Sequence, residues 1–268
     1  MRFLKRLVVF LLIIFFVPGA YFLMRNYALK PLAVPLVSPG QPTGRPGIRF
    51  AIFSDVHSDT KNLKKAIEIV ENNGIEMIII TGDLTTLGKK EELSSVKKLL
   101  DQSGLEYHVV PGNHDLWFGR QIKRDVFGEV FANQPTDFQK DNTKFILINN
   151  ADDNKGIIDL MEVEKELENC PRIFCLVFLH EPLNHPYSKH IMGESDPAIA
   201  SQAAFLINSF KQYQVKEVFA GHLHYASNYE LDGLKTTLVG SLATERNTQA
   251  PRFLEVLSKE ERKEVILE

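Results

Sequence analysis

The sequence predicts an α/β domain with mixed β-sheets, and three observations indicate this class. Apolar runs of strand length alternate with segments in which apolar residues recur at helical spacing. Several of these runs are apolar on both faces, which is typical of buried strands with helices on either side. The last runs follow one another closely with turns between them, which predicts antiparallel pairing near the C-terminus.

The first half of the domain contains three predicted strands and two predicted helices in alternation. The strands lie in "IRFAIFSD" (48–55), "EMIIITGD" (76–83) and "EYHVVPGNHD" (106–115). Between them, "TKNLKKAIEIVENNG" has an apolar face and stops at Gly74, and "KKEELSSVKKLLDQSG" stops in the same way at Gly104. Strand and helix therefore alternate in this half, as in an α/β domain.

The second half continues with further strands and two helices. A helix is expected over 159–169, and another begins at Asp196-Pro197, where an acidic residue followed by proline is a helix-start signal. The predicted strands are "KFILINN" (144–150), "RIFCLVFLH" (172–180), "EVFAGHLH" (217–224), "TTLVGS" (236–241), "RFLEVLS" (252–258) and "EVILE" (264–268).

The first 24 residues differ in composition from the rest. Leu7–Met24 carries no charge and follows three basic side chains. As a helix it would reach roughly 27 Å, close to the about 30 Å of a bilayer core. We therefore expect residues 1–24 to be a single-pass transmembrane anchor that holds the domain on the extracytoplasmic side of the cell membrane. A cleaved signal peptide, giving a secreted protein, is the alternative, although Pro18 disturbs the cleavage site.

Residues 25–47 are predicted to be a linker, and residues 48–268 one domain. The linker holds five prolines and three glycines. The chain is 44% hydrophobic and 24% charged, which suits one large core. Residues 1–47 hold six Lys or Arg and no acid, which leaves 25 basic against 34 acidic side chains and a net charge of −9 for the domain. Such a charge disfavours duplex nucleic acid as a partner.

Two cysteines, Cys170 and Cys175, lie five residues apart in "CPRIFC". They have neither the paired spacing of a zinc site nor the number that a disulfide framework needs. We expect both to be buried small hydrophobic residues.

Polar residues interrupt the ends of five apolar strands. Each has an ordinary interpretation as a helix cap, a turn residue or a buried histidine. However, five of the eight histidines occupy such positions, and ligands of open α/β sheets bind outside the carboxyl ends of the strands. The residues are Asp55, His57, Asp83, Asn113, His114, Asp115, His180, His222 and His224. We expect them to converge, with His222 and His224 on the same side of an extended strand.

The metal-ligating residue types among them predict a dinuclear centre. Two carboxylates, one amide and four imidazoles suit Mn, Fe or Zn, and they provide for two ions if one carboxylate is shared. Two ions about 3.5–4 Å apart activate a bridging hydroxide and stabilise a phosphoryl oxygen. This chemistry predicts hydrolysis of a phosphate ester.

The blocks "DVH", "GDLTT", "GNHD", "FLH" and "GHLH" resemble, in this order, those of the calcineurin-like metallophosphoesterases. The resemblance covers Ile48 to about Ser241 and implies a four-layer αββα fold, in which helices flank a sandwich of two mixed sheets. It implies that Asp55, His57 and His224 bind the first metal, that Asp83 bridges, and that Asn113, His180 and His222 bind the second. It further implies that His114 assists protonation of the leaving group and that Asp115 orients His114.

The sequence departs from the family after the "GD" block. Thr85 and Thr86 stand where many relatives have an acidic residue or Asn, so the support of the site there is open.

Two further segments are candidates for substrate contacts. The loop 181–197 is long enough for a lid beside His180. In "LWFGRQIKR", Trp117 and Phe118 either cover a substrate or belong to the core. The cations with a potential role in phosphate binding are Arg120, Lys123, Arg124 and Arg246, although the first three also suit a solvated helix face.

We therefore expect a membrane-tethered metal-dependent hydrolase of phosphate esters. Phosphodiesters or lipid-linked phosphates are favoured over soluble monoesters because the anchor keeps the site near a membrane. A catalytically silent binding scaffold is one alternative, and it predicts missing ligands. A nuclease is another, and it requires a basic groove that the charge disfavours.

Overall fold

The computed structural model describes residues 48–132, 134, 136–151 and 159–268. The predicted anchor and linker, residues 1–47, lie outside this part of the chain. Within the described residues, no helix has both the length and the apolar character that crossing a membrane requires. Pro46–Glu268 forms one compact unit.

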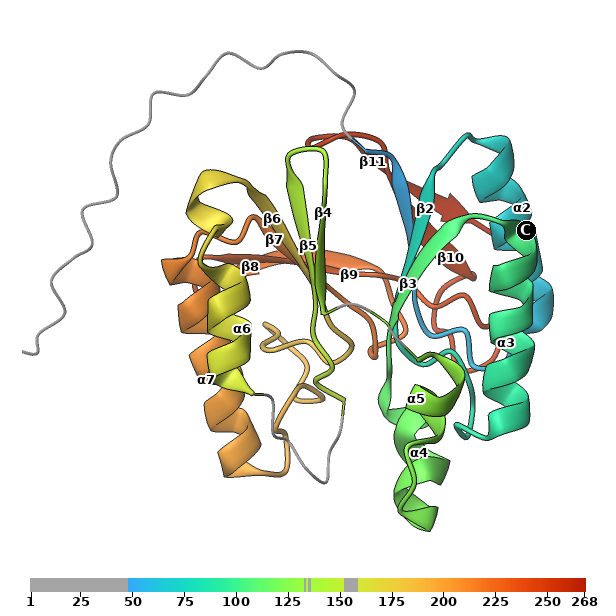
Figure 1. Ribbon diagram of the computed structural model, residues 1–268, viewed down its shortest axis with the longest axis horizontal. Coiled ribbons are helices and arrows are strands. Elements are labelled where there is room, and N and C mark those ends of the chain that lie inside the picture. Colours follow the sequence, from blue (N-terminus) through green and yellow to red (C-terminus); the bar gives the residue numbers. More distant parts are fainter. Residues whose placement is uncertain (1–47, 133, 135, 152–158) are drawn as a thin grey trace, which may run out of the picture. The chain divides into compact units, whose positions relative to one another are not determined.

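Two mixed sheets form the centre of the domain (Figure 1). In chain order the strands are β1 (Phe50–Phe53), β2 (Met77–Thr81), β3 (Glu106–Val110), β4 (Asp137–Lys140), β5 (Thr143–Leu147), β6 (Phe174–Phe178), β7 (Glu217–Ala220), β8 (Ser227–Leu231), β9 (Leu234–Leu238), β10 (Arg252–Val256) and β11 (Arg262–Ile266). The sheet orders are β11-β10-β1-β2-β3 and β4-β5-β6-β7-β9-β8. The central strands pair in parallel, and β10, β11, β4 and β8 join antiparallel.

Helices cover the outer face of each sheet. They are α2 (Thr60–Asn72), α3 (Lys90–Ser103), α4 (Asn113–Ile122), α5 (Val126–Val130), α6 (Leu160–Leu167), η1 (Cys170–Arg172) and α7 (Pro197–Gln212). Figure 1 shows α2 and α3 on one side of the two sheets, and α6 and α7 on the other. Asp59 and Asp196 cap α2 and α7 by accepting hydrogen bonds from backbone N–H groups of the first turn, as N-cap residues do.

The core has three apolar layers, one between the sheets and one beneath each group of helices. The layer between the sheets contains aromatic rings from both, such as Phe50 of β1, which lies edge-on to Phe145 of β5 at 5.3 Å between ring centres. The apolar face of α2, predicted from helical spacing, is buried on the first sheet. The expected α/β sandwich of two mixed sheets flanked by helices is therefore confirmed.

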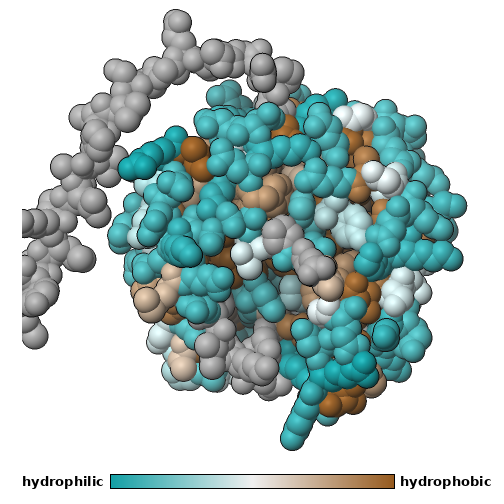
Figure 2. Space-filling model, viewed as in Figure 1, coloured by the Kyte–Doolittle hydropathy of each residue, from teal (hydrophilic) through white to brown (hydrophobic). Residues whose placement is uncertain are grey.

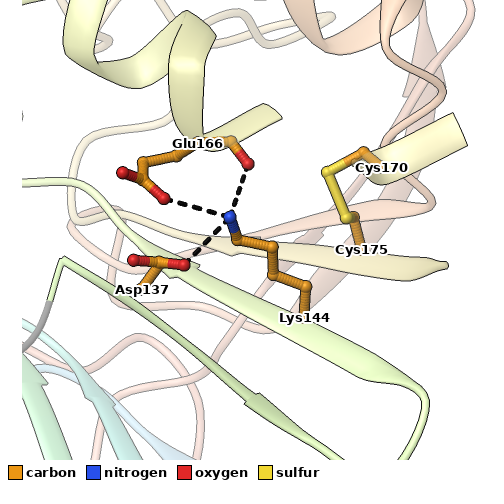
Figure 3. Close-up of a disulfide and its surroundings, with 5 residues drawn as sticks. All are labelled: Asp137, Lys144, Glu166, Cys170 and Cys175. Atoms are coloured by element: carbon orange, nitrogen blue, oxygen red, sulfur yellow. Dashed lines mark hydrogen bonds and ion pairs between the residues drawn. A yellow bond between two sulfur atoms is a disulfide. The ribbon is translucent and has the colours of Figure 1, made fainter. Parts of the chain in front are cut away.

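The two cysteines form a disulfide, so the expectation that they are only buried small hydrophobic residues is wrong. Both side chains are buried, but η1 turns the chain so that their Cα atoms lie 5.3 Å apart. Figure 3 shows the disulfide near Lys144, whose ammonium group contacts Asp137 at 2.9 Å and Glu166 at 3.0 Å. The disulfide closes a short loop, which the number of cysteines in the sequence does not indicate.

The surface is mainly hydrophilic on the face drawn in Figure 2, with apolar residues scattered between polar ones. Among the described residues, the most exposed large hydrophobic side chains are Tyr187 and Met161, at 93% and 82%. Trp117 is 43% exposed and lies on α4, next to the strand ends described below.

Candidate metal centre

Every predicted metal ligand follows the carboxyl end of a strand that pairs in parallel with a neighbour. On the first sheet, the segments after the parallel strands β1, β2 and β3 supply Asp55, His57, Asp83 and Asn113. On the second sheet, the segments after the parallel strands β6 and β7 supply His180, His222 and His224. The structure brings these residues together because all of these strands end at one edge of the sandwich.

The first ligand group consists of Asp55, His57, Asp83 and His224, whose ligand atoms all lie within 4.8 Å of one another. The Nε2 atoms of His57 and His224 are 3.1 Å apart. His57 Nε2 lies 3.6 Å from Asp83 Oδ2, and His224 Nε2 lies 3.4 Å from Asp55 Oδ1. Atoms bound to one Zn-like ion at about 2.0–2.2 Å are about 2.8–3.6 Å from their neighbours. The spacing fits one ion.

The second group consists of Asp83, His180 and His222, so Asp83 belongs to both groups. His180 Nε2 lies 3.5 Å from Asp83 Oδ1 and 3.2 Å from His222 Nδ1. Asn113 Oδ1 lies 3.1 Å from His180 Nε2 and adds an amide oxygen to this group. The arrangement fits a second ion that shares the Asp83 carboxylate.

The direction of the ring hydrogen bonds supports this interpretation. His180 Nδ1 donates to the carbonyl of Thr81 at 2.8 Å, and His224 Nδ1 donates to the carbonyl of Arg246 at 3.1 Å. A carbonyl only accepts, so each neutral ring presents its Nε2 lone pair to the centre. The nitrogen lone pairs and the carboxylate oxygens therefore point toward one another. These electron-rich atoms repel one another unless protons or metal ions lie between them.

Burial and charge set the protonation of the imidazoles. Burial lowers the pKa of His57 to about 4 and that of His222 to about 3, so both are neutral ligands at pH 7. Burial alone would lower the pKa of His180, but Asp83 and Asp55 raise it to about 10. Burial also disfavours ionised Asp83, yet His180 and His57 hold the pKa of its carboxyl well below the ordinary value. Binding of a metal ion through His180 Nε2 would require this imidazole to release a proton.

The backbone at the ligands is strained. Asp55, His57, Asp83, His222 and His224 have φ values of 51°, 44°, 52°, 71° and 57°. Residues other than glycine rarely adopt this left-handed region, and those that do concentrate at functional sites. Hydrogen bonds hold these turns, among them His57 N to Asp83 O at 2.9 Å and His222 N to the Asp55 carboxylate at 3.1 Å.

One expectation about the histidines after β7 is wrong. Strand β7 ends at Ala220, so residues 221–224 are not extended. The turn sends His222 to the second ligand group and His224 to the first, rather than placing both on the same side of a strand.

His114 lies beside the first group, with its ring centre 4.8 Å from that of His57. The predicted orientation of His114 by Asp115 is wrong, because His114 Nδ1 lies 2.7 Å from the carbonyl of Thr86 instead. The buried Asp115 carboxylate accepts hydrogen bonds from the backbone N–H groups of Gly112, Leu84 and Thr85 and from the Thr85 hydroxyl. The two threonines that depart from the family pattern therefore support the site.

The candidate cations differ in their positions. Arg120 donates to the carbonyls of Asn113 at 3.1 Å and Ala151 at 3.2 Å and so braces the start of α4, and its role in phosphate binding stays a prediction. Arg124 pairs with Glu129, and Lys123 is exposed. Arg246 contacts a site side chain, because its Nη1 lies 3.2 Å from His114 Nε2.

The aromatic candidates separate into one at the site and one in the core. The ring of Trp117 lies 5.5 Å from that of His114, whereas Phe118 packs against the core beneath the first sheet. In the loop 181–197, His190 stacks on His222 at 4.4 Å and bonds Glu194 at 2.8 Å. His190 lines a pocket of about 320 Å³ beside the second ligand group. It follows no strand, so sequence reasoning missed it.

Comparisons with known proteins agree with this geometry. A family model described as calcineurin-like phosphoesterase matches residues 48–226. A probable cyclic nucleotide phosphodiesterase from Vesicomyosocius okutanii is 25% identical over 197 residues, covering 70% of this chain and 79% of the relative. A 3',5'-cyclic-nucleotide phosphodiesterase from a Nostoc species is 27% identical over 157 residues, and the match spans 56% of each chain.

Solved structures share the fold at low identity. A dimetal phosphatase from Danio rerio is 14% identical with a TM-score of 0.58, and the match covers 83% of this chain and 99% of that one. GAP50, described as the anchor in the inner membrane complex of Plasmodium, is also 14% identical with a TM-score of 0.55, covering 83% and 84%.

Proposed function

The chain belongs to the calcineurin-like phosphoesterase family and is a hydrolase of phosphate esters, and we propose that its substrates are phosphodiesters, hydrolysed with two divalent metal ions. The observation that carries this proposal is the pair of ligand groups that share Asp83. The relatives named as cyclic nucleotide phosphodiesterases support the diester class. Lipid-linked diesters belong to the same class, and Mn, Fe and Zn all suit the oxygen and nitrogen ligands.

In this proposal each ligand keeps the role that its position suggests. Asp83 would be shared by both ions. The first ion would be held by Asp55, His57 and His224, and the second by Asn113, His180 and His222. When bound, such a pair of ions acts as a Lewis acid on the phosphoryl group and on the attacking water.

His114 is the proposed proton donor to the leaving oxygen. Its Nδ1 is fixed by the carbonyl of Thr86, which leaves Nε2 to face the reacting group. Positioned general acids contribute about 10²–10⁴-fold to the rate. His114 Nε2 is outside both ligand groups, so its loss is expected to leave metal binding intact.

The test compares variants of the full-length protein loaded with Mn or Zn. We expect bis(p-nitrophenyl) phosphate to be hydrolysed faster than p-nitrophenyl phosphate. His114→Gln should retain the metal content, measured by mass spectrometry, but lose about 10²–10⁴-fold in turnover. Asp83→Ala should lose both metal and turnover, and His108→Gln, on β3 away from the centre, is the matched control. If wild type turns over no faster than Asp83→Ala, the proposed activity is wrong.

The alternatives account for less of the site. A solved neighbour with this fold is described as an anchor, and this description supports a binding scaffold as the alternative. A silent scaffold does not require seven converged ligands and a histidine beside them, all of which are present here. A nuclease requires a basic groove, whereas residues 48–268 carry a net charge of −9.

We also propose that residues 1–24 anchor the chain with the domain on the extracytoplasmic side. The Cys170–Cys175 disulfide supports this location, because disulfides persist mainly in oxidising compartments. The mass of the mature protein from a membrane fraction tests it. An intact N-terminus supports the anchor, a cleaved one supports secretion, and free thiols in freshly isolated protein would contradict both.

A further inference from the structure

Arg246 connects two histidines of the site through two different groups. It lies in the loop between β9 and β10, with a left-handed φ of 60°. Its carbonyl accepts from His224 Nδ1 at 3.1 Å, and its guanidinium Nη1 lies 3.2 Å from His114 Nε2. The backbone of this residue thus supports a predicted metal ligand, while its side chain meets the predicted proton donor.

The direction of the second contact follows from the first contact of His114. Nδ1 of that ring faces the carbonyl of Thr86, which can only accept, so Nδ1 carries the proton and Nε2 of the neutral ring accepts. An arginine N–H can only donate. The guanidinium therefore donates to Nε2 of the neutral His114 ring. To protonate a leaving oxygen, His114 must carry a second proton on Nε2, and the contact of this nitrogen with Arg246 Nη1 is then released, so the guanidinium and the leaving oxygen approach Nε2 from the same side in turn.

The loop that carries Arg246 is fixed on the loop that carries the first ligands. Ala243 N and Ser241 Oγ donate to the carbonyl of Asp55 at 3.1 Å and 2.9 Å. Thr244 N donates to the Asp59 carboxylate at 3.1 Å. These bonds place the Arg246 backbone in a constant position relative to the metal ligands, as preorganised binding residues require.

The charge of Arg246 is available to an anion. The side chain is exposed, and among the described residues no carboxylate forms an ion pair with it. It lines a pocket of about 390 Å³ together with His57, Ser58 and Thr86, which border the first ligand group. Arg120 differs in this respect, because its guanidinium donates to backbone carbonyls.

We propose that Arg246 is a substrate-positioning residue whose guanidinium binds a non-bridging oxygen of the phosphodiester and places the leaving oxygen at His114 Nε2. This inference rests on the proposed phosphodiesterase function. The planar fork of arginine matches two phosphate oxygens, so Arg246 also selects the orientation in which the ester group points toward His114.

The test separates the side chain from the backbone. Arg246→Gln removes the charge but keeps the carbonyl that accepts from His224, so the metal content should equal that of wild type. Binding of inorganic phosphate to the Mn-loaded full-length protein, measured by calorimetry, should weaken about 10- to 100-fold, and kcat/KM for bis(p-nitrophenyl) phosphate should fall by a similar factor. Arg246→Lys should recover part of both losses.

Arg124→Gln is the matched control, because Arg124 is an exposed arginine that pairs with Glu129. Phosphate affinity of Arg246→Gln within twofold of wild type, or loss of metal from this variant, would overturn the inference. Failure of wild type to hydrolyse any diester while Arg246→Gln still loses phosphate affinity would overturn the proposed function and leave Arg246 as an anion-binding residue.

Discussion

Replacement of Asp115 distinguishes a structural role from a catalytic one. The carboxylate is fully buried and accepts hydrogen bonds from the backbone N–H groups of Leu84, Thr85 and Gly112. Asp115→Ala leaves these three donors buried without a partner. Each such group costs about 1–3 kcal/mol, and partial relaxation of the loops leads us to expect a total of about 3–6 kcal/mol. This is a large share of the about 5–15 kcal/mol that stabilises a typical domain.

Thermal unfolding measures this loss. For a domain of this size, 1 kcal/mol corresponds to about 2–4 °C, so Tm should fall by about 6–24 °C. Asp115→Asn keeps one acceptor oxygen and should lose less. The matched control is Asp125→Ala, which removes an exposed cap of α5 and should cost about 1 kcal/mol.

The contrary result is specific. If Asp115→Ala unfolds within 1 kcal/mol of wild type and yet loses turnover as His114→Gln does, then Asp115 acts on His114. The hydrogen bonds from Gly112, Leu84 and Thr85 would then contribute less to the free energy of unfolding than we expect.

Two further predictions concern stability. Metal-free protein should be most stable near pH 6.5. Below pH 6.5, stability falls because the unfolded chain protonates His57 and His222, whose pKa values in the folded protein are lowered to about 4 and 3. Above pH 6.5, stability falls as the pH rises towards about 10, because His180 in the folded protein holds a proton that the unfolded chain releases near pH 6.5. Calorimetry from pH 4 to 10 checks this, and a flat profile from pH 6.5 to 9 would contradict it. Cys170→Ala should lower the free energy of unfolding by about 2 kcal/mol, as should reduction of wild type, because a short loop is released in the unfolded chain; urea unfolding measures both, and equal stability before and after reduction would refute it.

The position of the site residues at strand ends could be predicted from the sequence, because ligands of α/β sheets bind at the carboxyl ends of the strands. Buried parallel strands are recognisable as apolar runs, and their carboxyl ends lie at a common edge, so Asp55, Asp83 and His180 could be grouped without coordinates. The edge strands β4 and β8 were not predicted. Their residues are largely half-exposed or exposed, so neither forms the apolar run that marks a buried strand.

Contacts that depend on loop geometry could not be predicted. Thr86 orients His114 through a backbone carbonyl, which carries no side-chain signature. The turn after β7, with His222 and His224 in left-handed conformations, separates two histidines that an extended chain would place together. His190 reaches His222 from a long loop whose path is fixed only by tertiary packing.

The position of β1 has a consequence for synthesis of the protein. It is an inner strand of its sheet, yet its neighbour β10 comes from the far end of the chain, with Phe50 opposite Val256. While the ribosome makes the residues between them, one edge of β1 has no partner, and unpaired apolar edges promote aggregation. A chain truncated before Arg252 would keep all seven proposed ligands but leave β1 as an edge, so we expect the last strands to determine whether newly made protein remains soluble.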